Sequence, residues 1–349
     1  MAGGRKSKKP DSPCQWISET DAFKEFATHV GKTQSARHIK PLHWYIACRL
    51  VLEGGFHPDS ITPRPPFKVD IVRSKKSKKN RYLLSFDPSL GLSGEQVILG
   101  GLKTKNVDVV VNLHHIGPVL AVSCKGVTKA FRNLTNRMEE TIGECTNLHI
   151  TYPAMVIGYF AVLRANRTLK DAAEAADLDE DDDASESEDM DAAAEGASAA
   201  EIVGDIDPSS TSKASAANDI AIDDHGQVSD GIVRFHAALR EMTGRRGIRD
   251  EISRYEAMTI VMVEPKGNHP GSVFAGFPEA ESPLQLSLFF KTLYQRYEER
   301  FVYGAPLLAD RGITTRFAWD PESPVFLREA GSENWPALNF EPRHGPDGQ

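Results

Sequence analysis

The order of apolar and polar positions predicts helices separated by strands. Residues 41–53 (PLHWYIACRLVLE) are apolar at helical spacing, open with a proline and stop at Gly54-Gly55, which are the signals of a helix start and end. The same spacing predicts three further helices, at residues 128–147, 231–242 and 283–303. Each lies next to a short apolar run, so helices and strands alternate along the chain.

Short runs rich in β-branched and aromatic residues predict the strands. They lie at residues 69–72, 82–86, 107–112, 119–123, 154–163 and 258–263. The third and fourth runs, VDVVVN and VLAVS, are joined through Gly117-Pro118 and are expected to pair. Strands that alternate with helices in this way predict an α/β fold, with a mixed β-sheet flanked by helices.

Segments of different composition follow one another along the 349 residues. We expect a basic arm and entry segment at 1–36, a core in two parts at 37–171 and 225–303, an insert at 172–224 and an irregular tail at 304–349. The insert is mostly Ala, Asp, Glu and Ser, and it has too little apolar surface to offset chain entropy, so we expect it to be disordered. It is either a tolerated loop or a nucleic-acid mimic that shields a basic surface.

Most of the negative charge is confined to one segment. Residues 171–207 hold sixteen acidic residues and no lysine or arginine, so the formal net charge of −8 becomes +8 when they are removed. The basic remainder is typical of a protein with a polyanionic partner. No apolar run reaches the roughly 20 residues that a membrane span needs, and residues 1–10 lack the layout of a secretory signal. We therefore expect no membrane association, a cytoplasmic location and reduced cysteines.

Two charged residues stand out in the strands at 107–112 and 119–123. Asp108 interrupts one apolar run, and Lys125 closes the other. Buried sheet positions rarely hold charges without a partner or a metal. Side chains alternate along a strand, so Ser123 and Lys125 share a face, and in an antiparallel hairpin this face can converge with Asp108 at one end.

This pattern resembles the PD-(D/E)XK nuclease superfamily, whose core hairpin carries Asp on one strand and Glu-x-Lys on the next. The resemblance implies a restriction endonuclease-like core. Here the pattern is Asp108 followed by Ser123-Cys124-Lys125, with Ser123 in place of the usual carboxylate and no proline before Asp108. In a subset of type II restriction enzymes, the missing glutamate has moved to the following helix. The helix at 128–147 offers Glu139, Glu140 and Glu144.

Helical geometry selects one of these glutamates. A buried face defined by Phe131, Leu134, Met138 and Ile142 places Glu139 at its boundary and turns Glu140 and Glu144 to solvent. Glu139 is therefore the predicted replacement. The resemblance adds an acid from an upstream helix, for which Glu53 is the candidate.

Phosphodiester hydrolysis explains these residue types. Asp108, Glu139 and Glu53 would hold Mg²⁺, with Mn²⁺ as an alternative ion, and the ion would activate a water molecule. Lys125 would position or help deprotonate the water and neutralise phosphate, with a pKa that burial lowers. Ser123 could hydrogen-bond a bound water molecule.

These expectations together predict a type II restriction or related antiviral defence endonuclease that cuts double-stranded DNA. A homodimer is expected because cutting both strands needs two sites, and a type II system implies a methyltransferase encoded separately. Two basic clusters are predicted to contact DNA phosphates. Their members are Arg73, Lys75, Lys76, Lys78, Lys79 and Arg81, and then Arg245, Arg246 and Arg249.

Other readings stay open. Asp108 could cap a strand end while Lys125 reaches solvent at the sheet edge. A repair or junction nuclease, an inactive DNA-binding module, and a protein whose acidic insert binds a basic partner would share most of these features. The histidines offer a competing metal site at His38, His43, His57 and His114-His115.

Overall fold

Five strands form the central sheet of the computed structural model, which describes residues 12–30, 37–73, 80–129, 131, 134–174, 219–327 and 335–345. Their order is β1 (Ile61–Thr62), β6 (Val109–Leu113), β7 (Gly117–Val127), β8 (Val156–Arg164) and β9 (Ala257–Val263). β6 pairs antiparallel with β1 and β7, whereas β7, β8 and β9 run parallel. The sheet is therefore mixed, as predicted.

The parallel strands are buried along nearly their whole length. Every residue of β8 and β9 is buried, and both sequences, VIGYFAVLR and AMTIVMV, are almost continuously apolar. Strands covered on both faces need such runs, because no side chain on either face reaches water. β6 and β7 join through a tight turn in which His115 adopts a positive φ of 69°.

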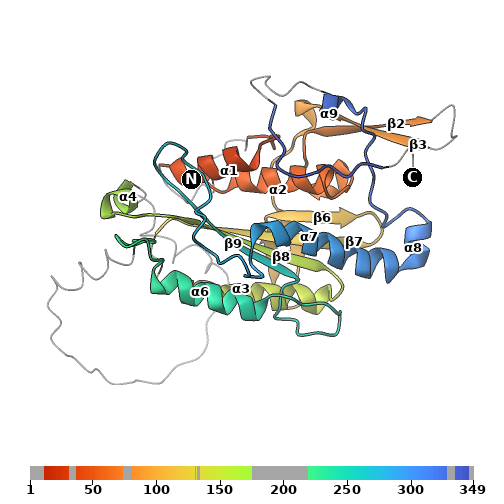
Figure 1. Cartoon of the computed structure of the whole chain (residues 1–349). Coiled ribbons are helices and arrows are strands. Elements are labelled where there is room, and N and C mark those ends of the chain that lie inside the picture. The colour runs from red at the N-terminus through yellow and green to blue at the C-terminus, as the bar shows by residue number, and fades with distance from the viewer. Residues whose placement is uncertain are drawn as a thin grey trace, which may run out of the picture.

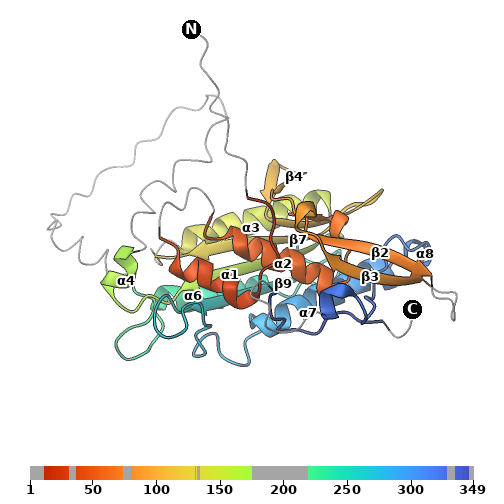
Figure 2. The same cartoon turned by 90° about the horizontal axis from the view of Figure 1, so that it is seen from above.

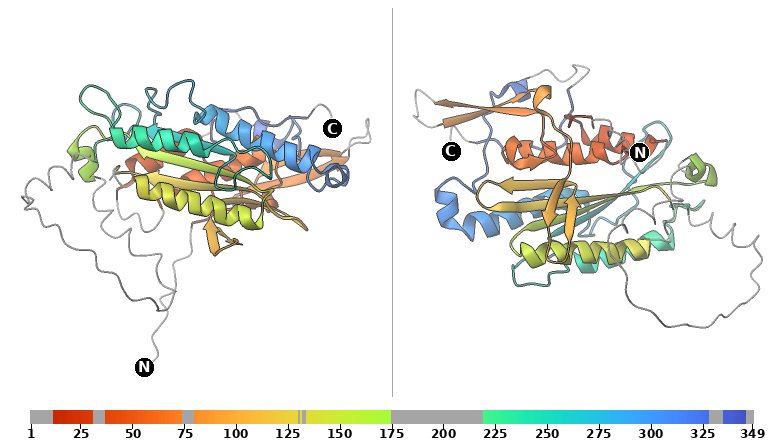
Figure 3. Two further views of the ribbon diagram at one scale, coloured as in Figure 1. Left: turned by 90° about the horizontal axis from the view of Figure 1, so that it is seen from below. Right: turned by 180° about the vertical axis from the view of Figure 1, so that it is seen from behind.

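Helices cover both faces of the sheet (Figures 1 and 2). α1 (Glu19–Thr28), α2 (Lys40–Leu52) and α7 (Leu286–Tyr297) contribute to one apolar core. α3 (Leu134–Thr151) and α6 (Asp230–Met242) lie side by side on the other face and form a second core (Figure 3). α2 is apolar on almost all sides, which explains why it lies deep inside the protein.

Two small sheets flank the central one. β2 (Phe67–Arg73) pairs with β3 (Asn80–Phe86), and β4 (Gln96–Leu99) pairs with β5 (Thr104–Val107). Asn147 of α3 binds the turn between β4 and β5, since its side chain accepts from the N–H groups of Leu102 and Lys103 and donates to the carbonyl of Lys103. This contact holds the start of β5 against α3.

Short helical segments complete the described chain. They are η2 (Pro58–Ser60), η3 (Pro88–Leu90), α4 (Leu169–Glu174), η5 (Glu298–Tyr303), α8 (Pro306–Asp310) and α9 (Pro324–Leu327). η5 extends α7 as a π-helix, so the helix predicted at 283–303 is present with a shorter regular part. α1, β1 and β4 were not predicted from the sequence.

The predicted insert is wider than the structure allows. Residues 175–218 lie outside the described part of the chain, so the prediction of disorder there stays a prediction. Residues 172–174 end helix α4, and Ala221 and Ile222 are fully buried in the second core. Described structure therefore extends into both ends of the predicted insert at 172–224, as part of helix α4 at one end and as residues of the second core at the other.

The C-terminal tail binds the end of α2. Trp319 is fully buried, and its indole N–H donates to the carbonyl of Val51 at 2.7 Å. The Arg343 N–H donates to the Leu52 carbonyl at 2.8 Å. The last carbonyls of a helix have no partner within the helix. The tail supplies a partner for the Leu52 carbonyl and a second donor for the Val51 carbonyl, which also accepts from the Gly55 N–H. The expected irregular tail thus packs on the domain, with only α8 and α9 helical between 304 and 327.

Within the described residues, we find no helix that has both the length and the apolar character to cross a bilayer.

Replacing Trp319 with alanine should lower the free energy of unfolding by about 3–5 kcal/mol, because it removes a buried indole and leaves a cavity. Urea unfolding followed by circular dichroism measures the loss. Tyr303, which is 74% exposed, supplies the control: Tyr303→Ala should change the value by less than about 0.5 kcal/mol. A loss below about 1 kcal/mol for Trp319→Ala would mean that the tail does not support the core.

Candidate functional site

Asp108 lies in the bend where the chain leaves β5 and enters β6. Its neighbours Val107 and Val109 are buried, and its own side chain is 19% exposed. Oδ2 accepts a hydrogen bond from the backbone N–H of Cys124 on β7 at 2.7 Å. Burial raises the pKa of Asp108 despite this hydrogen bond and the charge of Lys125. The carboxylate is thus fixed at the open end of the β6–β7 hairpin.

Lys125 lies near the end of β7, at the same end of the hairpin. Its Nζ is 3.2 Å from Glu140 Oε1. Burial lowers the pKa of Lys125, but the charges of Glu144, Glu140 and Asp108 outweigh burial, and the pKa is raised overall. The expectation that this pKa falls is wrong for the protein without a bound ion. The predicted antiparallel hairpin is confirmed, and Asp108 and Lys125 both lie at its open end.

Two glutamates of α3 face this end of the hairpin. Lys105 Nζ lies 3.7 Å from Glu140 Oε1 and 3.7 Å from Glu144 Oε2. Glu144 is only 6% exposed, and burial raises its pKa against the opposing charges of Lys125 and Lys105. Burial also raises the pKa of the more exposed Glu140, but the same lysines, led by Lys125, outweigh burial and lower it overall. The site therefore alternates carboxylates and ammonium groups.

The predicted orientation of Glu139 is wrong. It is exposed, whereas Glu140 and Glu144 point towards Lys125 and Lys105. The buried face of α3 is formed by Leu134, Thr141, Cys145 and Leu148. At 100° per residue, Glu144 lies about 70° from the centre of this face and Glu139 about 150°. The sequence argument misplaced the face because Phe131 precedes the helix and Ile142 is 38% exposed.

Ser123 lies beside this arrangement, whereas Glu53 lies apart from it. Ser123 is 2% exposed within β7, between Val122, which pairs with Val109, and Cys124, whose N–H binds Asp108. Glu53 follows the last residue of α2, where it pairs with Arg49 at 2.6 Å and accepts from the Tyr294 hydroxyl at 3.1 Å. Ten residues of helix, about 15 Å, separate Glu53 from His43. The structure therefore does not bring Glu53 to Asp108.

His43, from the first turn of α2, does reach the site. Its Nε2 lies 3.7 Å from Asp108 Oδ1, and the ring is 4% exposed. Burial lowers the pKa of His43 to about 4, so the ring is neutral at pH 7. Donor atoms of His43, Asp108 and Cys124 all lie within 4.8 Å of one another. The sequence offered His43 only as part of a competing histidine site.

The residues present fit a divalent ion. Carboxylates and a neutral imidazole are ordinary metal ligands. Two buried atoms of these side chains have no hydrogen-bond partner, His43 Nε2, which is 3.7 Å from Asp108 Oδ1, and Glu144 Oε2, which is 3.7 Å from Lys105 Nζ. Buried polar atoms are normally satisfied, so these two are available for a ligand.

The second predicted basic cluster is only partly on the surface. Arg246 and Arg249 are exposed, but Arg245 is 1% exposed. Arg245 Nη1 lies 2.8 Å from Glu256 Oε1, and Arg300 Nη2 lies 2.7 Å from the same oxygen. Arg245 is therefore a buried structural cation, and its assignment to a DNA-contacting surface is wrong. Clustered arginines in a sequence do not reveal which one turns inward.

The first predicted basic cluster lies mostly outside the described residues. This applies to Lys75, Lys76, Lys78 and Lys79. Arg73 is exposed, but Arg81 forms ion pairs with Asp320 and Glu322 of the C-terminal tail. Arg73 and Arg81 lie at the free end of the β2–β3 hairpin, which projects in the direction in which β6 runs (Figure 1). Asp108 precedes β6, so this end of the hairpin is remote from the candidate site.

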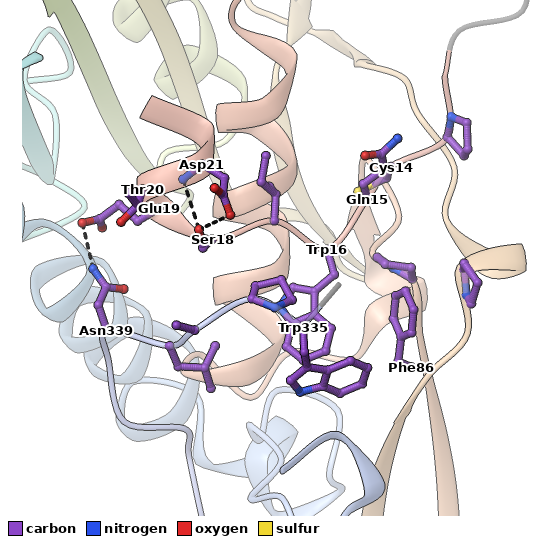
Figure 4. A pocket seen from close by; sticks show the side chains of 17 residues that line it. Cys14, Gln15, Trp16, Ser18, Glu19, Thr20, Asp21, Phe86, Trp335 and Asn339 are labelled. Carbon is purple, nitrogen blue, oxygen red and sulfur yellow. Dashed lines mark hydrogen bonds between the residues drawn. The ribbon is translucent and has the colours of Figure 1, made fainter. Parts of the chain in front are cut away.

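A cavity of about 730 Å³ lies elsewhere, between the segment before α1 and the C-terminal tail. Figure 4 shows Trp16, Phe86 and Trp335 grouped on one side of it. On another side, Asn339 Nδ2 donates to Glu19 Oε1 at 2.7 Å. No residue of the Asp108 site lines this cavity, so its position does not bear on the chemistry of that site.

Arg245→Ala should lower the free energy of unfolding by about 3–5 kcal/mol at pH 7, because it leaves the buried Glu256 with less compensation. Arg246→Ala is the matched control and should cost less than about 0.5 kcal/mol. Chemical denaturation of both variants measures the difference. Equal losses of unfolding free energy in the two variants, or no loss in either, would contradict the assignment of Arg245 as a buried structural cation.

The pH dependence gives a second check of the same variant. Burial raises the pKa of Glu256, but His149, Arg300 and the Ile157 N–H outweigh burial and leave it below its usual value. A lowered acid pKa stabilises the fold above the unfolded pKa, and this contribution is lost as the pH falls through the folded pKa. The difference in the free energy of unfolding between the wild type and Arg245→Ala should therefore become smaller as the pH falls.

A scan against protein family models, a search of curated proteins and a search of solved structures find no match to this chain.

Proposed function

We propose that this protein is a divalent-metal-dependent endonuclease that hydrolyses phosphodiester bonds of double-stranded DNA. One observation carries the proposal: Asp108 and Lys125 meet at one end of the β6–β7 hairpin, opposite two glutamates of α3. A carboxylate, an ammonium group and further carboxylates around one point are the groups that phosphodiester hydrolysis needs.

The order of elements around the site supports the proposal. The hairpin is followed by helix α3, which crosses to β8, and β8 lies parallel to β7. The PD-(D/E)XK resemblance leads us to expect an Asp and Lys hairpin followed by a helix that supplies a glutamate. With Glu144 or Glu140 in place of Glu139, the chain offers this arrangement, which a restriction endonuclease-like core would use.

Each residue has a chemical task in the proposed reaction. When bound, a divalent ion stabilises the charge that develops on the phosphate and provides a nucleophile at neutral pH. Asp108 and Glu144 would hold the ion, since both are fixed by the sheet and α3. Lys125 keeps its proton because the carboxylates raise its pKa, so it would neutralise the phosphate rather than act as a base. Lys105 would add to this positive charge.

The substrate and biological setting are part of the proposal. The net charge of +8 outside residues 171–207 favours a polyanion. A type II restriction or antiviral defence role, with Mg²⁺, a homodimer and a separately encoded methyltransferase, follows from the resemblance. A repair or junction nuclease would use the same site, and mapping the cut ends would separate the two, since only the restriction enzyme cuts at one sequence.

One observation favours a second candidate, an inactive DNA-binding module. Lys105 and Lys125 already neutralise Glu140 and Glu144, and the usual acid on β7 is replaced by the buried Ser123. Carboxylates whose charge is already balanced by lysines do not need a metal ion for compensation. Such a module would bind DNA in a salt-dependent manner without cutting it.

Glu144→Gln should reduce divalent-ion-dependent cleavage of plasmid DNA by about 100-fold or more, because the change removes a carboxylate that the reaction needs. Asp108→Asn and Lys125→Met should do the same. Glu139→Gln is the matched control on the exposed face of α3 and should cut like the wild type. Gel analysis of initial rates measures all four variants.

One result would count against the choice of Glu144 as ligand, and another against the nuclease proposal itself. Loss of cleavage in Glu139→Gln with normal rates in Glu144→Gln would restore the sequence-based choice of ligand. A folded wild type that binds DNA but cuts neither supercoiled nor phage DNA with Mg²⁺ or Mn²⁺ would support the inactive module.

A further inference from the structure

We propose that His43 is a metal ligand together with Asp108, and that its imidazole makes the site select a first-row transition ion such as Mn²⁺ over Mg²⁺. This inference adds to the proposed function. It rests on that function only for the action of the bound ion on DNA, and not for the binding of the ion itself. The sequence-based ligand set was all oxygen, with Mg²⁺ as the expected ion. The structure adds a nitrogen donor from a different element.

The spacing of the donors fits a shared ion. His43 Nε2 and Asp108 Oδ1 are 3.7 Å apart, which is too long for a hydrogen bond. Two neighbouring ligands that each lie about 2.1 Å from one ion are roughly 3.0 Å apart in octahedral geometry and roughly 3.4 Å apart in tetrahedral geometry. A movement of less than about 1 Å would therefore bring both atoms onto one ion.

The position of Asp108 leaves one oxygen for this role. The backbone N–H of Cys124 holds Oδ2, so Oδ1 is the oxygen turned towards His43. The Cys124 thiol is the third donor of the group. It comes from β7, whose pairing with β6 and β8 fixes its place. Ligands from α2, the β5–β6 bend and β7 thus meet at one point.

The buried ring of His43 has no hydrogen bond at Nε2 that would give the ring a purely structural role. Nε2 has no hydrogen bond, although the ring is 4% exposed. A buried polar atom without a partner destabilises a fold, so such atoms often mark a ligand site. α2 is packed on all sides, and the helix therefore holds the ring where it is.

The donor types decide which ion is preferred. Mg²⁺ favours oxygen ligands in octahedral geometry and keeps several waters. Imidazole and thiol donors suit first-row transition ions better than Mg²⁺, and among these ions Zn²⁺ is bound more tightly than Mn²⁺. Replacing one oxygen ligand by His43 therefore weakens the preference for Mg²⁺ and strengthens that for Mn²⁺ and Zn²⁺.

The test begins with the wild-type protein and Mn²⁺ alone. Pulsed electron paramagnetic resonance of bound Mn²⁺ should show modulation from a directly coordinated ¹⁴N nucleus. Competition titrations should give a dissociation constant for Mn²⁺ at least about tenfold lower than for Mg²⁺, as expected when a nitrogen ligand replaces oxygen. Neither measurement depends on DNA cleavage or on a substitution.

Three variants then assign the donors. His43→Gln should abolish the ¹⁴N signal and weaken Mn²⁺ binding by about tenfold or more, with little effect on Mg²⁺. His38→Gln is the matched control, because His38 is also buried nearby but lies outside the group. It should keep the signal. Cys124→Ala should weaken Zn²⁺ more than Mn²⁺. Circular dichroism establishes that each variant is folded.

The outcomes separate this inference from the nuclease proposal. Mn²⁺ bound without ¹⁴N modulation, a signal lost in His38→Gln instead, or equal affinity for Mg²⁺ would overturn the role of His43. If Mg²⁺ then still supported cleavage, the nuclease would stand with an oxygen-only site. Mn²⁺ bound through His43 with no cleavage of DNA would sustain the inference and refute the nuclease.

Discussion

The fold depends on keeping charge out of a sheet that helices cover on both faces. β8 and β9 are buried throughout, so an ionised group that enters this region must bring its counter-charge with it. Two charged residues near the sheet lie at strand ends, where each is paired with residues of opposite charge. Glu256, just before β9, is compensated by Arg245 and Arg300. Lys125, near the end of β7, is compensated by glutamates of α3.

These two ionic centres differ in which kind of buried atom lacks a hydrogen-bond partner. Both carboxylate oxygens of Glu256 are used, one by the two arginines and the other by the Ile157 N–H, and the atoms without a partner there are donors, Nε of Arg245 and Nε of Arg300. At the Asp108 centre, the atoms without a hydrogen-bond partner are His43 Nε2 and Glu144 Oε2, which are both of a type that can bind a cation. This contrast, rather than charge alone, singles out the Asp108 site.

Periodicity was sufficient to predict four of the five strands of the central sheet, the β6–β7 hairpin and helices α2, α3, α6 and α7, but not α1 or β1. Periodicity failed where a neighbouring helix or turn decides whether a side chain points to the core or to solvent. The face of α3 is set by α6 and the β4–β5 turn, which the sequence did not place, so Glu139 was chosen over Glu144. α2 has no polar face, so His43 gave no sign of where it points. Arg245 looked like its exposed neighbours because burial in a loop leaves no periodic signal.

The bond between the tail and α2 constrains the order in which this protein can fold. Trp319 donates to Val51 across 268 positions of sequence, and Arg343 donates to Leu52, so these contacts at the end of the first long helix wait for residues that are synthesised long after it. Before the tail is bound, α2 exposes its C-terminal end and apolar side chains that are buried in the folded protein. The growing chain therefore passes through a stage in which its most apolar helix needs protection from association with other chains.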